Sequence, residues 1–142
     1  MQPSAWALFV PASSLFVLSC SDDPPSPAGC APVQVDAGCS ALYEPTFDQV
    51  FDRTLKPSCA ASGVSCHSSR GRQGGLAFEE REESYALLTR ENGPIVAGDP
   101  ACSGLVARLT STNGKFRMPP GRSLDAAEQC SIIQWIARGA KR

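Results

Sequence analysis

Residues 59–67 read Cys-Ala-Ala-Ser-Gly-Val-Ser-Cys-His and contain two of the chain's seven cysteines and its only histidine. Met118, the only methionine apart from the initiator, lies 51 residues after His67 and precedes Pro119. Thiol, imidazole and thioether groups are all ligands of transition metals or anchors of their prosthetic groups. The rest of the chain has to show which kind of site these side chains form.

Cys66 and His67 form the second half of Cys-x-x-Cys-His, the sequence that attaches haem c. In that signature the cysteines form thioethers with the haem vinyl groups, the histidine is the proximal iron ligand, and a distant methionine can close the other axial position. Here Gly63 occupies the position of the first cysteine, and the nearest upstream thiol is Cys59. Three interpretations stay open: haem held by Cys66 alone, haem held by Cys66 and Cys59 through an enlarged loop, or a haem-free domain with a Cys59–Cys66 disulfide.

The composition fits one modest domain. The chain has 142 residues, of which 42% are apolar and 19% charged, so a small globular core is expected. Residues 1–52 contain six acidic and no basic residues, whereas residues 53–142 contain thirteen basic and eight acidic residues. This basic excess is too weak and scattered to indicate nucleic-acid binding, but it suits docking to an acidic protein partner. Seven cysteines favour an oxidising compartment, and the odd count requires another fate for at least one of them.

The first twenty residues predict a lipoprotein signal. Residues 5–19 form an apolar run that is shorter than the roughly 20 residues a membrane-spanning helix needs, and it fits the hydrophobic region of a signal peptide. The run ends in Val-Leu-Ser-Cys, which resembles a bacterial lipobox and predicts lipidation of Cys20; an ordinary cleaved signal is the alternative. We therefore expect a signal peptide over 1–20, a Pro-rich linker over 21–44 and a domain over 45–142, in a protein anchored by lipid to the cell envelope, facing the periplasm or in the outer membrane.

Helical patterns without useful strand alternation predict an all-α fold of about four short helices with long loops. The first helix begins with Thr46 as its N-cap and ends at Pro57, the second spans 79–91, the third starts near residue 99, and the last begins with Asp125 as its N-cap. A core of this size rarely contributes more than about 3–5 kcal/mol. Disulfides or a buried haem are therefore needed to order the loops.

Four further cysteines are disulfide candidates. Cys30 and Cys39 lie close together in the sequence, so a local disulfide is expected, with bridges into the domain as the alternative. Cys102 and Cys130 fall in or near the last two predicted helices. A disulfide between them would tie the loop that carries Met118 across its base.

Two other chemistries fit the sequence poorly. A structural zinc site needs several cysteines with His67, and the chain has no Cys-x2-Cys pair. Adjacent Cys66 and His67 cannot easily face each other as nucleophile and base.

The order of motifs over about residues 45–140 is similar to that of small c-type cytochrome domains of bacterial lipoproteins, including the planctomycete-type cytochrome c domain. The motifs that carry this resemblance are Thr46-Phe47, Val50, Cys66-His67, Gly74-Gly75-Leu76, Gly98-Asp99-Pro100, Ser103, Leu105, Met118-Pro119, Leu124 and residues 135–140.

The resemblance implies a cytochrome c fold in which the first and last helices cross, and a covalent haem c with His67 and Met118 as axial ligands. It implies an electron carrier rather than an enzyme, which would be monomeric, have redox proteins as partners and contact the membrane only through its lipid anchor. The competing hypothesis is a haem-free, disulfide-stapled lipoprotein with a binding or structural role.

Overall fold

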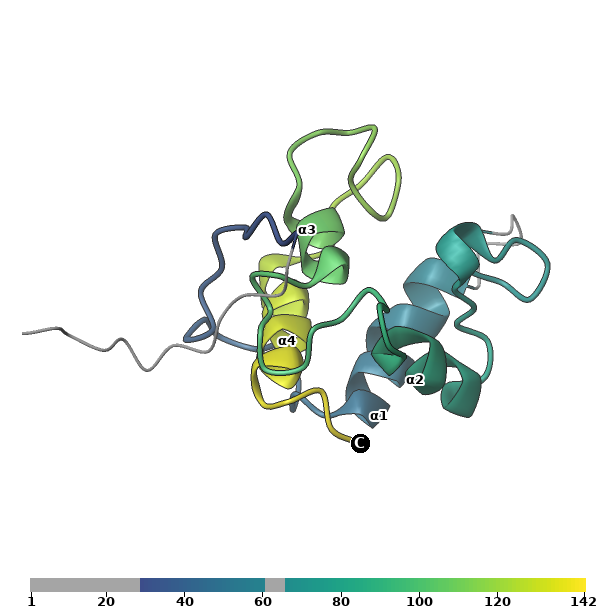
Figure 1. Ribbon diagram of the computed structural model, residues 1–142, viewed down its shortest axis with the longest axis horizontal. Helices are drawn as coiled ribbons and strands as arrows, with labels where there is room; N and C mark the ends of the chain where they lie inside the picture. Colours follow the sequence, from purple (N-terminus) through teal and green to yellow (C-terminus); the bar gives the residue numbers. More distant parts are fainter. Residues whose placement is uncertain (1–28, 61–65) are drawn as a thin grey trace, which may run out of the picture.

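The computed structural model describes residues 29–60 and 66–142, and within these ranges it contains helices and no strand. The all-α prediction is confirmed for this part of the chain (Figure 1). The elements in chain order are helix α1 (Phe47–Val50), the π-helix η1 (Phe51–Ala60), the 3-10 turn η2 (Gln73–Gly75), α2 (Arg81–Thr89), α3 (Gly104–Thr110) and α4 (Ala126–Ala137).

The first helix is longer than expected. Its start agrees with the sequence, since the Thr46 side chain accepts a hydrogen bond from the backbone N–H of Gln49 at 3.4 Å. The predicted stop at Pro57 is wrong, because the chain continues as a π-helix to Ala60. A π-helix has a wider turn than an α-helix, which relieves the contact between a proline ring and the preceding turn. Cys59 therefore lies on a helix rather than in a loop.

The core forms where the first helix packs against α4. Phe47 and Trp135 are both buried, and their ring centroids are 5.5 Å apart. Tyr85 of α2 meets the edge of Phe47 with its centroid at 4.9 Å, so three helices share one aromatic cluster. The expected contact between the first and last helices is present, and Figure 1 shows α2 lying beside the first helix.

A Schellman motif ends α4. Gly139 has a positive φ of 93°, its N–H donates to the carbonyl of Ile136, and the N–H of Ala140 donates to the carbonyl of Trp135. The indole N–H of Trp135 then donates to the carbonyl of Lys141 at 2.7 Å. The C-terminal residues are thus folded back onto the core aromatic that joins the helices.

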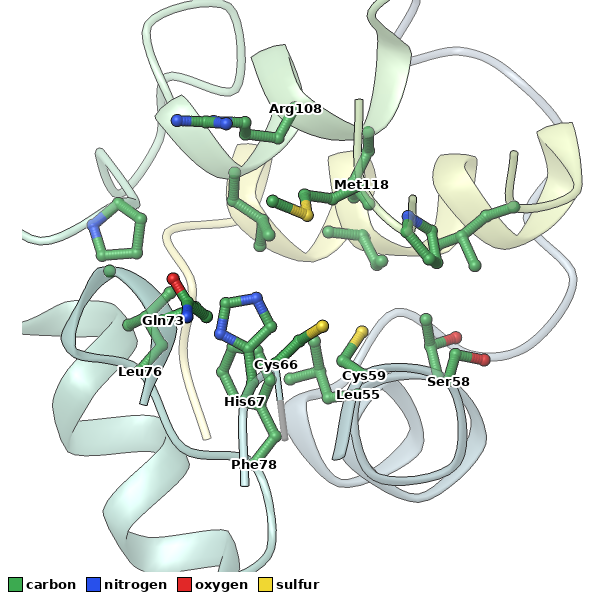
Figure 2. Close-up of a pocket in the computed structure, with 18 of the residues that line it drawn as sticks. Leu55, Ser58, Cys59, Cys66, His67, Gln73, Leu76, Phe78, Arg108 and Met118 are labelled. Atoms are coloured by element: carbon green, nitrogen blue, oxygen red, sulfur yellow. The ribbon is translucent and has the colours of Figure 1, made fainter. Parts of the chain in front are cut away.

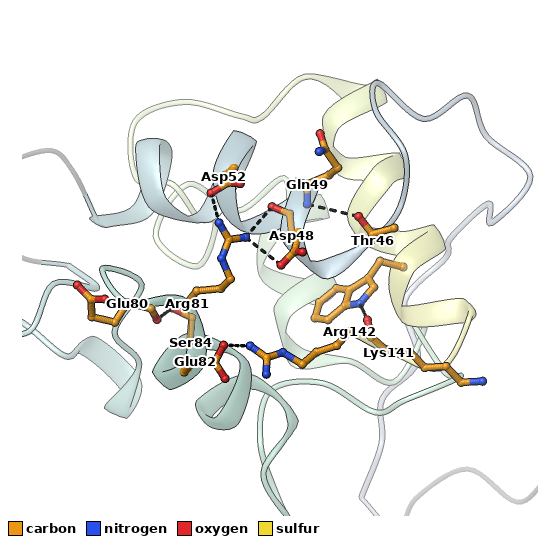
Figure 3. Close-up of polar contacts among 11 residues, drawn as sticks. Thr46, Asp48, Gln49, Asp52, Glu80, Arg81, Glu82, Ser84, Lys141 and Arg142 are labelled. Carbon is orange, nitrogen blue, oxygen red and sulfur yellow. Dashed lines mark hydrogen bonds and ion pairs between the residues drawn. The ribbon is translucent and has the colours of Figure 1, made fainter.

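Arg81, the first residue of α2, connects α2 to the first helix. Its guanidinium lies 2.9 Å from the carboxylate of Asp48 and 2.7 Å from that of Asp52, and 4.8 Å from the ring centroid of Phe51 (Figure 3). The carboxylates are exposed, so these pairs contribute little stability individually. The ion pairs of Arg81 fix the direction in which the chain enters α2 after the loop that follows His67.

Two disulfides connect distant parts of the chain, and their pairing differs from the expected one. Cys30 is bonded to Cys102 and Cys39 to Cys130, so the alternative of bridges into the domain is the one found, and the expected Cys30–Cys39 and Cys102–Cys130 bonds are not formed. The sequence cannot determine connectivity, because four cysteines allow three pairings and tertiary packing selects one.

The segment before the first helix is attached to α4 by hydrogen bonds as well. The N–H of Leu42 donates to the carbonyl of Ala127 at 2.9 Å, and the Gln134 side chain donates to the carbonyl of Cys39 at 2.6 Å. Residues 29–44, which the sequence assigned to a linker, therefore lie against the helical unit in the structure.

Two expectations fall outside the described residues. The proposed signal and lipobox with Cys20 lie within residues 1–28, and Gly63 lies within residues 61–65. In the ranges that are described, no helix combines the length and apolar character needed to cross a bilayer.

Breaking the Cys39–Cys130 bond by a Cys39→Ala/Cys130→Ala double substitution should lower the free energy of unfolding by about 2–5 kcal/mol, because the bond spans 91 residues and restricts the unfolded chain. Denaturant unfolding measures this change. The matched Cys39→Ala/Cys102→Ala variant should lose more, since it removes one partner from each bond. If the Cys39→Ala/Cys102→Ala variant were as stable as the Cys39→Ala/Cys130→Ala variant, the pairing would be wrong. Peptide mapping that links Cys30 to Cys39 would show the same.

Candidate functional site

A cavity of about 680 Å³ opens between the end of the first helix, the loop over residues 66–78 and the segments from α3 to α4. This volume lies within the range of roughly 300–1,000 Å³ that is typical of sites for small molecules and cofactors. Most of its lining is apolar; Leu55 of η1, Leu105 and Leu109 of α3, and Ile132 of α4 meet there.

The four sequence-predicted ligands all line this cavity: Cys59, Cys66, His67 and Met118. Figure 2 shows the His67 ring directed towards Met118, which lies on the opposite side of the cavity. The sulfur atoms of Cys59 and Cys66 lie side by side next to His67. The fold thus brings together a helix end, the loop after it and a second loop far along the chain.

Backbone contacts hold the loop that carries His67. The carbonyl of Cys66 accepts a hydrogen bond from the N–H of Gln73, and the carbonyl of His67 accepts one from the N–H of Phe78, both at 2.7 Å. The ring of Phe78 packs beside the imidazole, with the ring centroids 5.0 Å apart. These hydrogen bonds order the loop around the histidine, while loop residues such as Gln73, Gly74 and Gly75 stay exposed to solvent.

His67 is held as a neutral imidazole. Burial is the main cause and lowers the pKa of His67 below its ordinary value of 6.5, while the nearby backbone of Leu76 and Gln73 acts in the opposite direction. The buried Nδ1 atom of His67 has no hydrogen-bond partner among the described residues, which shows that neither backbone group is well aligned for a hydrogen bond to it. A neutral ring has one nitrogen with a free lone pair, which is the form that binds metals.

Arg108 positions the loop that carries Met118, and sequence analysis missed it. The backbone carbonyl of Arg108 accepts a hydrogen bond from the N–H of Met118 at 3.0 Å. Its guanidinium donates to the carbonyl of Phe116 at 3.2 Å and lies 4.0 Å from the centroid of the Phe116 ring. No sequence signal marks this role, because an arginine near the end of a short helix looks like any solvated residue.

The charged lining of the cavity is entirely basic. Among the residues that the structure describes, the charged side chains that line it are Arg108 and Arg122, and no carboxylate does. An apolar cavity with two guanidinium groups suits a ligand that has an apolar body and anionic substituents.

Cys59 and Cys66 are free thiols, whereas the other four described cysteines are paired. The Cys59–Cys66 disulfide of the haem-free interpretation is therefore not formed in the structure. Burial is the main cause that raises the pKa of Cys59 to about 12; the charges of Glu128 and Cys66 act in the same direction, and Arg122 acts against them. The Cys59 side chain stays a protonated thiol at neutral pH, which slows its oxidation and exchange.

The donor set suits a haem better than a bare metal ion. Across residues 29–60 and 66–142, no three His, Cys, Asp or Glu side chains gather in a group that could hold an ion. A structural zinc site needs four such ligands. An imidazole facing a thioether, with free thiols alongside, matches the two axial ligands and the covalent anchors of a haem c. The buried, unpartnered Nδ1 atom of His67 and the apolar cavity wall fit the same group.

Comparison with known proteins gives one match. Residues 64–121 match the model of the family described as planctomycete cytochrome C, a range that contains Cys66, His67 and Met118 but begins after Cys59. No curated protein and no solved structure matches the chain. The match agrees with the resemblance found in the sequence and supports a planctomycete-type cytochrome c-like domain over residues 64–121.

Proposed function

We propose that the protein is a haem c-binding, electron-transfer lipoprotein of the bacterial cell envelope, acting as an electron carrier rather than an enzyme. The observation that carries this proposal is that His67 and Met118 face each other across an apolar cavity with Cys66 beside them (Figure 2). A bound haem supplies the one-electron chemistry, and the protein supplies attachment, orientation and burial.

Each ligand has a distinct task. The Cys66 thiol would anchor the haem, and the neutral imidazole of His67 and the thioether of Met118 would bind its iron. Phe78 keeps the imidazole in place through its ring contact and its backbone hydrogen bond. A methionine ligand would raise the reduction potential, and the apolar lining would keep water away from the iron.

The two cavity arginines support the same cofactor. A haem has an apolar macrocycle and two carboxylate groups, and Arg108 and Arg122 are the charged side chains available to them in this cavity. Charge-assisted hydrogen bonds from guanidinium to carboxylate are strong and directional. They would fix which edge of the cofactor points outward.

The sequence supports a proposal for the partners, the membrane attachment and the oligomeric state of the carrier. Residues 53–142 carry the basic excess, so the partners are redox proteins with acidic docking surfaces. Lipidation at Cys20 supplies the only membrane contact, and a monomer suffices for transfer of single electrons.

A haem-free, disulfide-stapled module is the second candidate. The bonds Cys30–Cys102 and Cys39–Cys130 favour it, since they order the chain without any cofactor. Free Cys59 and Cys66 beside His67 count against it, because a purely structural module has no use for two thiols at a cavity.

Production of the full chain in a host that matures c-type cytochromes should give a haem signal that survives denaturing electrophoresis, and a low-spin absorbance spectrum. His67→Ala should abolish the low-spin spectrum, because the proximal ligand is lost. Gln73→Ala, a neighbour that lines the same cavity, is the matched control and should keep it. Wild-type protein without haem would refute the proposal in favour of the stapled module, and an unchanged His67→Ala spectrum would refute the ligand assignment.

Arg108→Ala should weaken the methionine–iron charge-transfer band of the oxidised protein and lower the reduction potential, because the loop with Met118 loses the side-chain contacts of Arg108 and keeps only the backbone hydrogen bond to it. Potentiometric titration and the absorbance spectrum measure both effects. Arg122→Ala removes the same charge from the same cavity, yet Arg122 forms no hydrogen bond or ion pair with other described residues. It should retain the band; equal loss in both variants would indicate a charge effect instead of positioning.

A further inference from the structure

One thiol at the cavity has no role in the proposed function. Cys59 lies seven residues before Cys66 and outside the range that matches the family model. It nevertheless lines the same cavity, and its sulfur lies beside that of Cys66 in Figure 2. The position three residues before Cys66, where a second anchoring thiol is expected, holds Gly63.

The π-helix places Cys59 there. Because η1 continues through Pro57 to Ala60, its last turn forms a wall of the cavity. Leu55, Ser58 and Cys59 all line this wall, and Leu55 is buried. A thiol on a helix is held in one direction by its neighbours, so it is presented to a ligand without the entropy loss of ordering a loop.

Cys59 differs from the paired cysteines because it forms no disulfide in the structure. Cys30, Cys39, Cys102 and Cys130 find partners across the fold, while Cys59 and Cys66 remain unbonded although both reach the same cavity. A structural disulfide between Cys59 and Cys66 would be formed here, as the other two disulfides are. A pair meant to react with a ligand has to stay reduced until that ligand arrives.

We propose that Cys59 forms a second thioether with the haem and replaces the thiol that Gly63 cannot provide. This inference rests on the proposed function. The S–H group of Cys59 adds across the C=C bond of a vinyl group: a C–S and a C–H bond form, the S–H bond and the C=C π bond break, and the thiol hydrogen ends on the other vinyl carbon. No oxidant or reductant is consumed.

Peptide mapping of the matured full chain tests this directly. The protein is denatured, treated with iodoacetamide and cleaved with trypsin, which releases both thiols in one peptide over residues 54–70. We expect this peptide to carry haem and no alkyl group. Haem on Cys66 with an alkylated Cys59 would overturn the inference and leave the proposed function intact. A peptide without haem, either doubly alkylated or with a Cys59–Cys66 disulfide, would overturn both.

A spectroscopic test uses variants. In alkaline pyridine, the position of the haem α band depends on how many vinyl groups remain conjugated with the macrocycle, whatever the protein fold. Cys59→Ala should shift this band to longer wavelength, because one vinyl group is restored, and should keep the low-spin spectrum set by His67 and Met118. Ser58→Ala on the same helical turn is the matched control and should leave the band unchanged. An α band of Cys59→Ala at the wild-type position would overturn the inference. If that variant does not acquire haem, the peptide map of the wild-type protein decides.

Discussion

The contact between the first helix and α4 is the constraint on which the rest of the structure depends. At one end the Phe47 and Trp135 rings pack in the core, both almost fully buried. At the other end the Thr54 hydroxyl donates to the Glu128 carboxylate at 2.7 Å. Thr54 therefore accepts from the hydroxyl of Tyr43, which brings the N-terminal segment into the same network. Since Thr54 also lines the cavity, this polar contact fixes the position of the cavity wall relative to the core.

The loops depend on this frame for their order. Each ordered residue loses roughly 1–2 kcal/mol of backbone entropy, so loops such as 66–80 and 111–125 need contacts that offset that loss. The disulfides act away from the cavity, at the segment that covers α4 and at the start of α3. The loops on the cavity side are held by backbone hydrogen bonds, by side-chain contacts such as Ser69 N–H to the Glu79 carboxylate, and by the Arg108 contacts. A cofactor bound there would stabilise the folded state further by mass action.

The sequence predicted those features that depend on local chemistry. Thr46 and Asp125 both cap their helices with a side-chain oxygen. Gln49 and Glu128, three residues after these caps, accept hydrogen bonds from the side chains of Arg53 and Thr54 and make no return bond to the backbone of the cap. The oxygen of the cap residue alone therefore marks each helix start.

Features that depend on long-range packing could not be predicted. The disulfide pairing follows from the path of residues 29–44 along α4, which no local pattern encodes. The helical continuation past Pro57 required a π winding that is rare in general and therefore not expected. The same holds for Arg108, whose role arises only because Phe116 and Met118 return to α3.

The helical position of Cys59 shows how two thiols can reach the same side of a cavity without the usual spacing of the motif. A pair of thioethers requires two thiols at suitable places on one side of a cavity, and the usual short spacing achieves this with a single turn of chain. Here the longer spacing places one thiol on a helix end and the other in the loop beside His67, so the same side of the cavity is reached by two elements. With the second thioether proposed above, Gly63 would be tolerated, because the requirement would be met by where the sulfur atoms lie and not by how many residues separate them.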